Sequence, residues 1–201
     1  MVDQGPVVDG VIDDAVWASA EPIEDFIQAE PLQGTPSSER TVVRIVYTKS
    51  AIFVAVICYD SEPGNILITD GRRDSGMDDT DSFQMIFDTY HDRQNGFVFG
   101  TNPAGIEYDG QVSNEGQGGG GGRSGGGRQS SGAGGGFNRN WDASWKVRTR
   151  VNESGWTAEF EIPLRSLRYG DKPQVWGVNF LRTIRRKREQ VYWSPVDRIY
   201  N

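Results

Sequence analysis

The chain has 201 residues, a net charge of −7 and a pI of about 4.8. This length fits one domain with a substantial core, and the acidic balance argues against nucleic acid as a general partner, because phosphate binding needs a basic field. Cys58 is the single cysteine, which excludes an internal disulfide, and its place in the apolar run Ile52–Tyr59 favours a small buried hydrophobe.

We expect neither a membrane-spanning helix nor a signal peptide in this sequence. No apolar run reaches the roughly 18 residues of a membrane-spanning helix, and Met1-Val2-Asp3 does not begin a signal peptide. We therefore expect a cytoplasmic protein or one whose signal has been removed. Asp197–Asn201 lacks the character of a natural stop, so we expect a longer native chain.

Short elements are expected before residue 40. Val7–Val11 predicts a short strand and a turn, since Asp-Gly supplies turn chemistry. Asp13–Trp17 predicts one helical turn, with Asp13 as its cap and Trp17 plugging the end of a core. Ile23–Ile27 predicts an edge strand.

The clearest hairpin pairs Thr41–Tyr47 with Ala51–Tyr59, whose residues 52–58 are apolar on both faces and indicate a strand in the middle of a covered sheet. In Ser82–Asp88, apolar and polar residues alternate at period two, which predicts one face in the core and one open face. Further strands are predicted at Gly96–Thr101, Ile106–Val112, Trp145–Val151, Trp156–Ile162, Trp176–Ile184 and Gln190–Trp193, with a helical turn at Pro163–Leu167.

About ten short strands with almost no helix predict an all-β fold, an antiparallel β-sandwich of the jelly-roll or immunoglobulin-like kind. Gly116–Gly136 interrupts the pattern with 13 glycines in 21 residues. Such a segment cannot bury enough apolar surface to offset its ordering entropy, so we predict a disordered, flexible insertion within the single domain. A phosphate cradle is disfavoured because the lysine, hydroxyl and helix that it needs do not follow the glycines.

An acidic cluster lies at and before the strand Ser82–Asp88. Calcium takes six to eight oxygen ligands, often from carboxylates in loops, and the alternative is an ordinary solvated loop. The lone His91 offers little for a zinc site or a catalytic triad, and facing carboxylates for glycoside hydrolysis cannot be recognised in the sequence. The candidate metal ligands are Asp60, Asp78, Asp79 and Asp81.

Two of the six tryptophans occupy positions from which a ring face could meet a sugar. Trp141 follows the glycine insertion and Trp193 lies near the end of a strand; an indole face suits the apolar face of a pyranose, although packing at the rim of the core is the alternative. The remaining tryptophans fit core positions. The basic run Arg182–Arg188 is interpreted as a solvated hairpin tip that pairs with loop acids, with an anionic partner surface as the alternative.

Together the motifs, in this order, resemble the family 9 carbohydrate-binding-module-like domain over nearly the whole chain outside the glycine insertion. One branch, at the N-terminus of larger uncharacterised bacterial envelope proteins with a region that looks like an outer-membrane barrel, is closer still, through Asp88–Arg93, Asn102–Gly105 and Tyr192–Pro195. The motifs of the wider family are Val8-Asp9-Gly10, Asp13-Asp14, Trp17, Arg44–Asp60, Asp81–Asp88, Gly155–Pro163 and Trp176–Phe180.

The resemblance implies a β-sandwich, frequently with calcium, in an exported protein that is periplasmic, extracellular or associated with the outer membrane. Sugar-binding members hold a terminal sugar between two tryptophans, helped by a glutamate. Trp193 falls near one tryptophan, whereas Asp78 stands at the other and Gln84 at the glutamate, and the arginine and asparagine expected on the next strand are not evident in Phe97–Gly100. The candidate ligand residues are Trp193, Gln84, Trp141, Arg93 and Asn102.

The leading hypothesis is a module without catalytic activity that binds carbohydrate or a cell-envelope glycan and is stabilised by calcium, within a protein of carbohydrate catabolism or glycoside hydrolysis. The alternative is a structural or docking domain of an outer-membrane barrel protein, with no sugar ligand, which contacts the C-terminal domain of a longer chain. A haem-binding sandwich with axial ligands from Met77, Met85 and His91 is a third class, and no haem is expected because Met85 fits the core.

Overall fold

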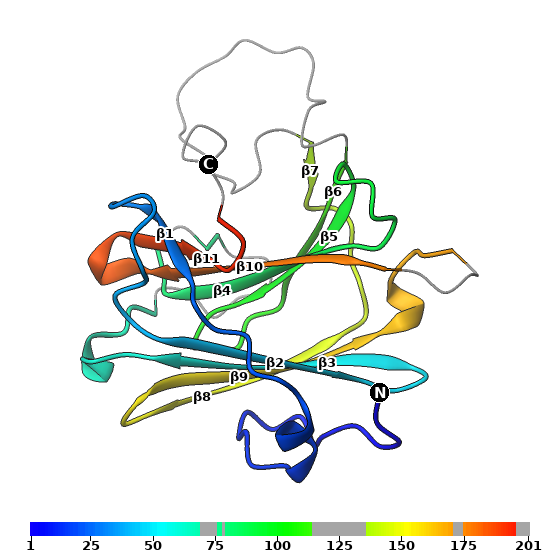
Figure 1. Cartoon of the computed structure of the whole chain (residues 1–201), viewed down its shortest axis with the longest axis horizontal. Coiled ribbons are helices and arrows are strands. Elements are labelled where there is room, and N and C mark those ends of the chain that lie inside the picture. Colours follow the sequence, from blue (N-terminus) through cyan, green and yellow to red (C-terminus); the bar gives the residue numbers. More distant parts are fainter. Residues whose placement is uncertain (69–75, 78, 114–135, 171–174, 196–201) are drawn as a thin grey trace.

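The computed structural model describes residues 1–68, 76–77, 79–113, 136–170 and 175–195. Two antiparallel sheets pack face to face (Figure 1), which confirms the predicted all-β sandwich. The larger sheet has the order β1-β11-β10-β4-β5-β6-β7, and the smaller has the order β2-β3-β9-β8. The described strands are β1 (Ile27–Glu30), β2 (Thr41–Tyr47), β3 (Ala51–Tyr59), β4 (Ser82–Asp88), β5 (Gly96–Thr101), β6 (Tyr108–Val112), β7 (Phe137–Asn138), β8 (Lys146–Asn152), β9 (Gly155–Pro163), β10 (Gly177–Ile184) and β11 (Glu189–Tyr192).

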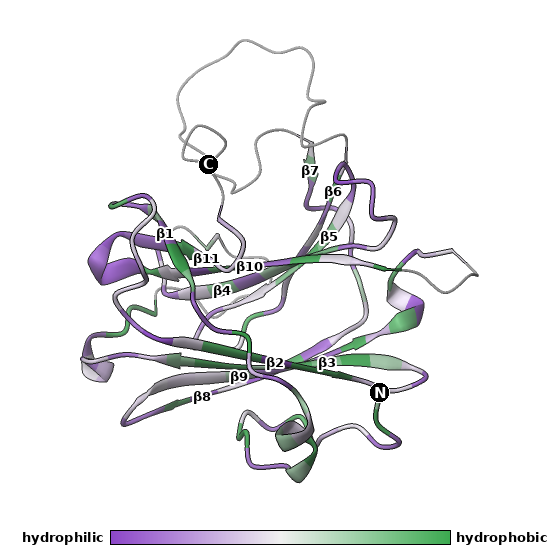
Figure 2. Cartoon of the chain, viewed as in Figure 1, coloured by the Kyte–Doolittle hydropathy of each residue, from purple (hydrophilic) through white to green (hydrophobic). Residues whose placement is uncertain are grey.

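The core strands follow the hydrophobic periodicity closely. β2, β3, β4 and β5 have the bounds predicted from the pattern. Central β3 lies between β2 and β9 and is buried over most of its length, as expected for a strand that is apolar on both faces. In Figure 2, β2 and β3 are hydrophobic along most of their length, whereas the turn between β10 and β11 is hydrophilic.

The space between the sheets is filled mainly by aromatic rings. Phe83 of β4 stacks on Phe180 of β10 at a centroid distance of 5.8 Å, and Phe160 of the opposite sheet lies 6.3 Å from Phe83. Trp145 stacks on Phe160 at 5.8 Å. Each ring removed from water contributes roughly 1.5–3 kcal/mol, so these contacts hold the two sheets in their relative position.

The N-terminal segment covers the outer face of the smaller sheet, beneath β2 and β3 in Figure 1. The 3₁₀ helix η1 (Ala15–Ser19) places Trp17 against Phe53 in a second, smaller core. Burial raises the pKa of the Cys58 thiol to about 12, in keeping with its prediction as a buried hydrophobe.

Several predicted elements near the N-terminus differ from the structure. Val7–Val11 forms a turn but no strand, and Asp14 rather than Asp13 precedes η1 and accepts a hydrogen bond from the backbone N–H of Val7. The edge strand begins at Ile27, and Ile23 makes only an isolated bridge to β2.

The remaining differences are small. β7 was not predicted, because its two residues show no periodicity. The helical turn predicted at Pro163–Leu167 is the 3₁₀ helix η4 (Leu164–Ser166), and two more 3₁₀ turns lie at η2 (Pro63–Asn65) and η5 (Arg185–Lys187).

The predicted glycine insertion lies outside the described residues apart from Gly136, as does Asp78. Among the described residues, no helix has the length and apolar character needed to cross a membrane.

Candidate ligand-binding face

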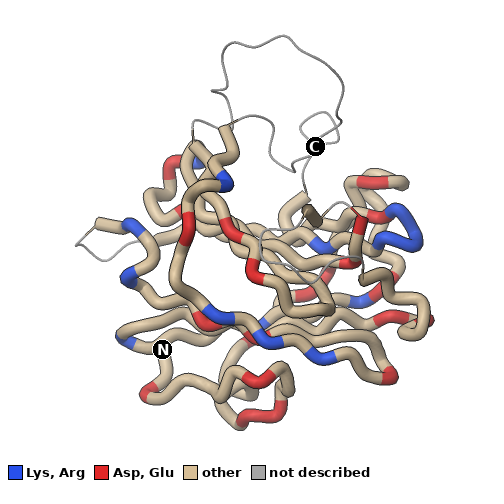
Figure 3. The backbone as a smooth tube through the Cα atoms, turned by 180° about the vertical axis from the view of Figure 1, so that it is seen from behind, with Lys and Arg blue, Asp and Glu red and all other residues tan. Residues whose placement is uncertain are grey.

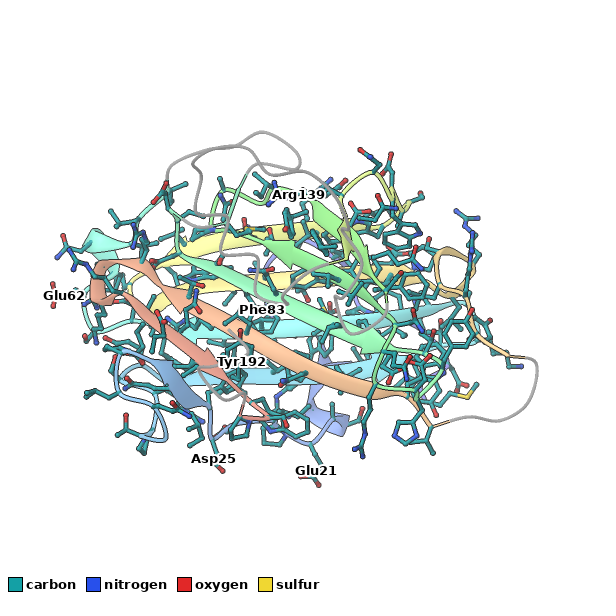
Figure 4. The ribbon with its side chains drawn as sticks, turned by 90° about the horizontal axis from the view of Figure 1, so that it is seen from above. Glu21, Asp25, Glu62, Phe83, Arg139 and Tyr192 are labelled. Carbon is teal, nitrogen blue, oxygen red and sulfur yellow. The ribbon has the colours of Figure 1, made fainter. Side chains whose placement is uncertain are left out.

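The outer face of the larger sheet carries the polar half of the β4 pattern. Phe83, Met85 and Phe87 fill the core, so Gln84 and Ile86 point away from it. Residues in register share a face, which places Leu181 beside Gln84, and both Asn179 and Val98 beside Ile86. Figure 4 looks onto this sheet, with β11, β10, β4 and β5 side by side.

A groove of about 600 Å³ follows this face towards the loop between β4 and β5, and a smaller hollow of about 60 Å³ adjoins it at Gln84 and Tyr192. Ligand sites usually have volumes of about 300–1,000 Å³, so the larger hollow, called the outer groove here, has room for a small ligand. It is lined by Ile86, Asp88, Arg93, Gln94, Asn95, Val112, Gly177, Val178, Asn179 and Ser194.

Two glycines of β5 leave space on this face of the sheet because they have no side chains. A Cβ on Gly100 would lie 2.9 Å from Cγ of Gln84, and a Cβ on Gly96 would lie 2.9 Å from Cδ1 of Ile86. Any side chain at either position would therefore displace the neighbouring β4 residue and reduce the space above the strand.

Some polar side chains of this face already form hydrogen bonds within the protein, whereas others do not. The Asn179 amide donates to Ser194 O (2.9 Å), and its Oδ1 accepts from Ser194 N (2.8 Å), so this side chain is fixed by the strand end. Asp88 accepts from the backbone N–H of Arg93 (2.7 Å) and thereby folds the β4–β5 loop. In the part of the chain that the structure describes, the Gln84 amide and the Arg93 guanidinium have no hydrogen-bonding partner and can bind a ligand.

The other candidate ligand residues lie away from the outer groove. Trp193 is the register neighbour of Phe180 and packs against it at 5.9 Å, on the core side of the sheet, with 37% of its surface exposed. Trp141 packs on Phe97 at 4.9 Å. Asn102 is buried in the β5–β6 turn, where its Oδ1 accepts from Ala104 N.

The structure thus places Gln84 in the smaller hollow and Arg93 in the adjoining outer groove, whereas the two tryptophans pack on core rings. Asn179 and Asn95 are lining residues that sequence reasoning missed. Asn179 could have been found from the alternation of β10, in which it occupies the outward position next to inward Phe180. Asn95 belongs to an irregular loop and gives no such signal.

Of the predicted acidic ligands, the described residues Asp60, Asp79 and Asp81 lie at the opposite end of β4, and arginine side chains bind two of them. Asp60 accepts from Arg186 at 2.5 Å, and the exposed Asp79 accepts from Arg185 at 3.0 Å. Asp81 accepts from the backbone N–H of Arg185 (2.7 Å), and burial raises its pKa.

Two of these carboxylates nevertheless have unused oxygens. Oδ2 of Asp60 and Oδ2 of Asp81 are buried and have no hydrogen-bond partner among the residues that the structure describes. Across the described ranges there is no group of three or more His, Cys, Asp or Glu side chains placed to hold a metal ion.

The basic run behaves partly as predicted. Arg186 and Lys187 of η5 both bind Glu39, which confirms the pairing of the tip with loop acids. Burial alone would raise the pKa of Glu39, but hydrogen bonds from Lys187 and Ser61 outweigh it and lower the pKa to about 2.

The assignment of Arg182 to the solvated tip was wrong, because Arg182 belongs to β10, points towards the smaller sheet and is only 1% exposed. It donates to Arg40 O (3.0 Å), Thr41 Oγ1 (3.1 Å) and Tyr59 O (2.7 Å), which join the larger sheet to the smaller one. The period-two pattern of β10 turns Arg182 to the same face as Phe180.

The residues considered for haem do not meet. Met85 lies in the main core, Met77 packs with Tyr108 on the outer side of the larger sheet, and His91 is exposed in the β4–β5 loop.

No family model matches the sequence, and no curated protein matches it closely enough to count as a relative. Solved structures do match. A family 9 carbohydrate-binding module from Caldicellulosiruptor kristjanssonii is 14% identical in complexes with cellotriose (TM-score 0.58, 95% of this chain and 80% of that chain) and with glucose (TM-score 0.60, 95% and 82%). A candidate carbohydrate-binding protein from Bacteroides uniformis is 12% identical (TM-score 0.61, 89% and 79%). The chain therefore has the fold of family 9 carbohydrate-binding modules, as its sequence motifs predicted.

Proposed function

We propose that the chain is a carbohydrate-binding module without catalytic activity and that it holds its ligand in the outer groove. The observation that carries the proposal is the Gln84 amide, which has no hydrogen-bonding partner among the described residues and lies with Ile86 and Val98 in the smaller hollow that adjoins the outer groove. A pyranose has an apolar C–H face and hydroxyl edges, and this combination of groups suits both. Support also comes from the fold that the chain shares with the family 9 module from Caldicellulosiruptor kristjanssonii, which was solved with cellotriose and with glucose.

Titration calorimetry with cellotriose and glucose, followed by xylan and bacterial glycan fragments, tests this proposal. Gln84→Ala removes one neutral hydrogen-bonding group, and losing about 1 kcal/mol weakens binding about fivefold. Arg93→Ala should weaken binding by a similar or larger factor. Calorimetry is the suitable readout because Trp193 and Trp141 lie on the other side of the sheet and need not report on the groove.

Trp193→Phe is the matched control. It keeps an aromatic ring against Phe180 and should leave affinity unchanged if the ligand lies in the outer groove. If the ligand instead stacks on Trp193, this variant loses binding and Gln84→Ala does not. Absence of saturable heat with every glycan tested would contradict the proposal.

A structural or docking role is the second candidate. The observation that favours it is that Trp193 and Gln84, both candidate sugar contacts, lie on opposite faces of the larger sheet. A module that binds no glycan but forms a stable complex with the remainder of a longer native chain would support this role. Export to the periplasm, cell surface or outer membrane is proposed on the sequence resemblance alone, and fractionation of cells that make the native protein would test it.

Calcium is a further part of the proposal and rests on the Oδ2 atoms of Asp60 and Asp81, which have no hydrogen-bond partner in the described part of the chain. Calcium needs about six to eight oxygens, so carbonyls or water would have to supply most of its ligands, and Arg186 already neutralises Asp60. Saturating calcium should raise the melting temperature, because ligation of the native state stabilises it. An unchanged melting temperature with calcium and with chelator would contradict this part.

A further inference from the structure

The outer groove contains one cation that is free to bind a ligand. Arg93 is the only lysine or arginine among the lining residues that the structure describes, and its guanidinium donates to no described residue. The largest basic segment of the chain is different. Figure 3 shows it as a run of basic positions at the turn between β10 and β11, where Arg186 and Lys187 already bind Glu39.

The loop between β4 and β5 fixes the backbone that carries this guanidinium. Asp88 accepts from Asp92 N (3.2 Å) and from Arg93 N (2.7 Å). Asp92 in turn accepts from Gln94 N (2.8 Å) and Asn95 N (2.9 Å). Arg93 has a φ of 60°, in the left-handed region that residues other than glycine seldom adopt. Such a conformation persists only where the surrounding structure holds it, so the position of Arg93 at the groove is set by the loop itself.

The other polar side chains at this end of the groove are mostly occupied. Both carboxylate oxygens of Asp88 accept loop amides. The Asn95 amide donates to Asp92 (2.7 Å), and Asn179 bonds to Ser194. The side-chain amide of Gln94 has no hydrogen-bonding partner in the described part of the chain. The free donors are therefore the guanidinium of Arg93 and the amide of Gln94.

These donors require a ligand group that is rich in acceptors. A guanidinium presents five N–H donors and no acceptor, whereas a sugar hydroxyl both donates and accepts. A carboxylate only accepts, and it takes two parallel N–H···O bonds from one guanidinium. The chain has a net charge of −7, so its overall field does not attract anions, and a local contact at Arg93 has to select the ligand.

We propose that the ligand of the outer groove carries a carboxylate on its sugar ring, as a uronic acid does, and that Arg93 selects it. The inference rests on the proposed carbohydrate-binding function and specifies the class of sugar. The carboxylate accepts two hydrogen bonds from Arg93, Gln94 donates to a neighbouring ring oxygen or hydroxyl, and Ile86 supplies apolar surface to the ring.

A matched pair of sugars tests the proposal by titration calorimetry in calcium-free buffer. The pair is cellotriose and the same trisaccharide with its primary alcohols oxidised to carboxylates. The oxidised sugar should bind at least about tenfold more tightly, because hydrogen bonds to an ionised group are about twice as strong as neutral ones. Added salt should weaken the binding of the oxidised sugar and leave that of cellotriose nearly unchanged, because salt screens charges.

Three variants separate the role of Arg93 from general effects on the groove. Arg93→Gln removes the charge and keeps an amide donor, so it should abolish the preference and leave the affinity for cellotriose within about threefold. Arg165→Gln makes the same charge change on η4, outside the groove, and should alter neither affinity. Gln84→Ala should lower both affinities by the same factor, because Gln84 lies in the adjoining hollow. Melting temperatures check that each variant folds.

The outcomes distinguish this inference from the function on which it rests. Equal affinities for the two trisaccharides, or a preference that survives Arg93→Gln, would overturn the inference and leave the proposed function standing. Absence of saturable binding by both sugars would contradict the two together. Tighter binding of glucose 6-sulfate than of glucuronate would assign a sulfate ester in place of the carboxylate and would also overturn the inference.

Discussion

Glu159 fastens the N-terminal segment to the smaller sheet, and its removal gives the sharpest test of the fold. Its buried carboxylate accepts hydrogen bonds from Asp9 N (3.0 Å), Gly10 N (2.9 Å) and Nε1 of Trp17 (3.0 Å). Glu159→Ala leaves these donors without an acceptor, two of them in buried surroundings. At about 1–3 kcal/mol for each buried unsatisfied donor, the loss should be about 3–5 kcal/mol.

For a chain of this length, 1 kcal/mol corresponds to a change of roughly 2–4 °C in melting temperature. Glu159→Ala should therefore melt at least about 6 °C lower than the wild type, and Glu159→Gln should lose less, because an amide oxygen still accepts one or two of the bonds. Differential scanning calorimetry measures the melting temperature, and hydrogen exchange at Gly10 reports release of the segment.

Glu161→Ala is the control, since Glu161 lies two residues further along the same face of β9 and forms only a surface ion pair with the exposed Lys146. Such a pair contributes about 0–1 kcal/mol. If both variants melt alike, the N-terminal segment is not held by Glu159 and the reasoning fails.

Three other predictions concern the charged and aromatic interior. The pKa of Glu39 is lowered to about 2. The stability that ionised Glu39 gives the folded protein is therefore complete above its ordinary pKa of 4.5 and is lost as the pH falls from about 4.5 to about 2. Chemical denaturation should show that Glu39→Gln reduces this pH dependence of the free energy of unfolding, by up to about 3 kcal/mol. Arg182→Lys should destabilise the protein by about 2–3 kcal/mol in urea unfolding, because one ammonium cannot reach three acceptors on two strands, and a melting temperature within one degree of the wild type would contradict this. Phe160→Ala should cost about 3–5 kcal/mol in the same assay, since the ring contacts both Phe83 and Trp145, whereas the exposed Tyr47→Ala should change little.

Hydrophobic periodicity predicted the regular strands because a strand with one buried face needs an apolar residue at every second position. β4 has the predicted bounds since three apolar residues at period two can bury themselves in only one register. Irregular segments gave no comparable signal. Val7–Val11 has the apolar content of a strand but is held as a turn by Glu159, a residue some 150 positions away, and such a contact cannot be recognised in a single sequence.

The site was harder to predict than the fold. Gln84 and Arg93 stay candidate ligand residues. Trp193 was grouped with them because it lies near a strand end and near a tryptophan position of the resembling family, whereas the hydrogen bond from its backbone N–H to Phe180 O turns its ring to the other face. Arg182 was assigned to the tip because it belongs to the basic run, although its position in β10 turns it inward. In each case strand parity was more informative than chemical character.

The central claim is that the ligand lies on the outer face of the larger sheet. Titration of an isotope-labelled sample with cellotriose, followed by amide and side-chain chemical shifts, tests it most directly. We expect saturable shifts at Gln84, Arg93 and Asn95, with the indole signal of Trp193 unchanged. Shifts confined to Trp193 and its neighbours, or no shifts at all with cellotriose and the other glycans, would contradict it.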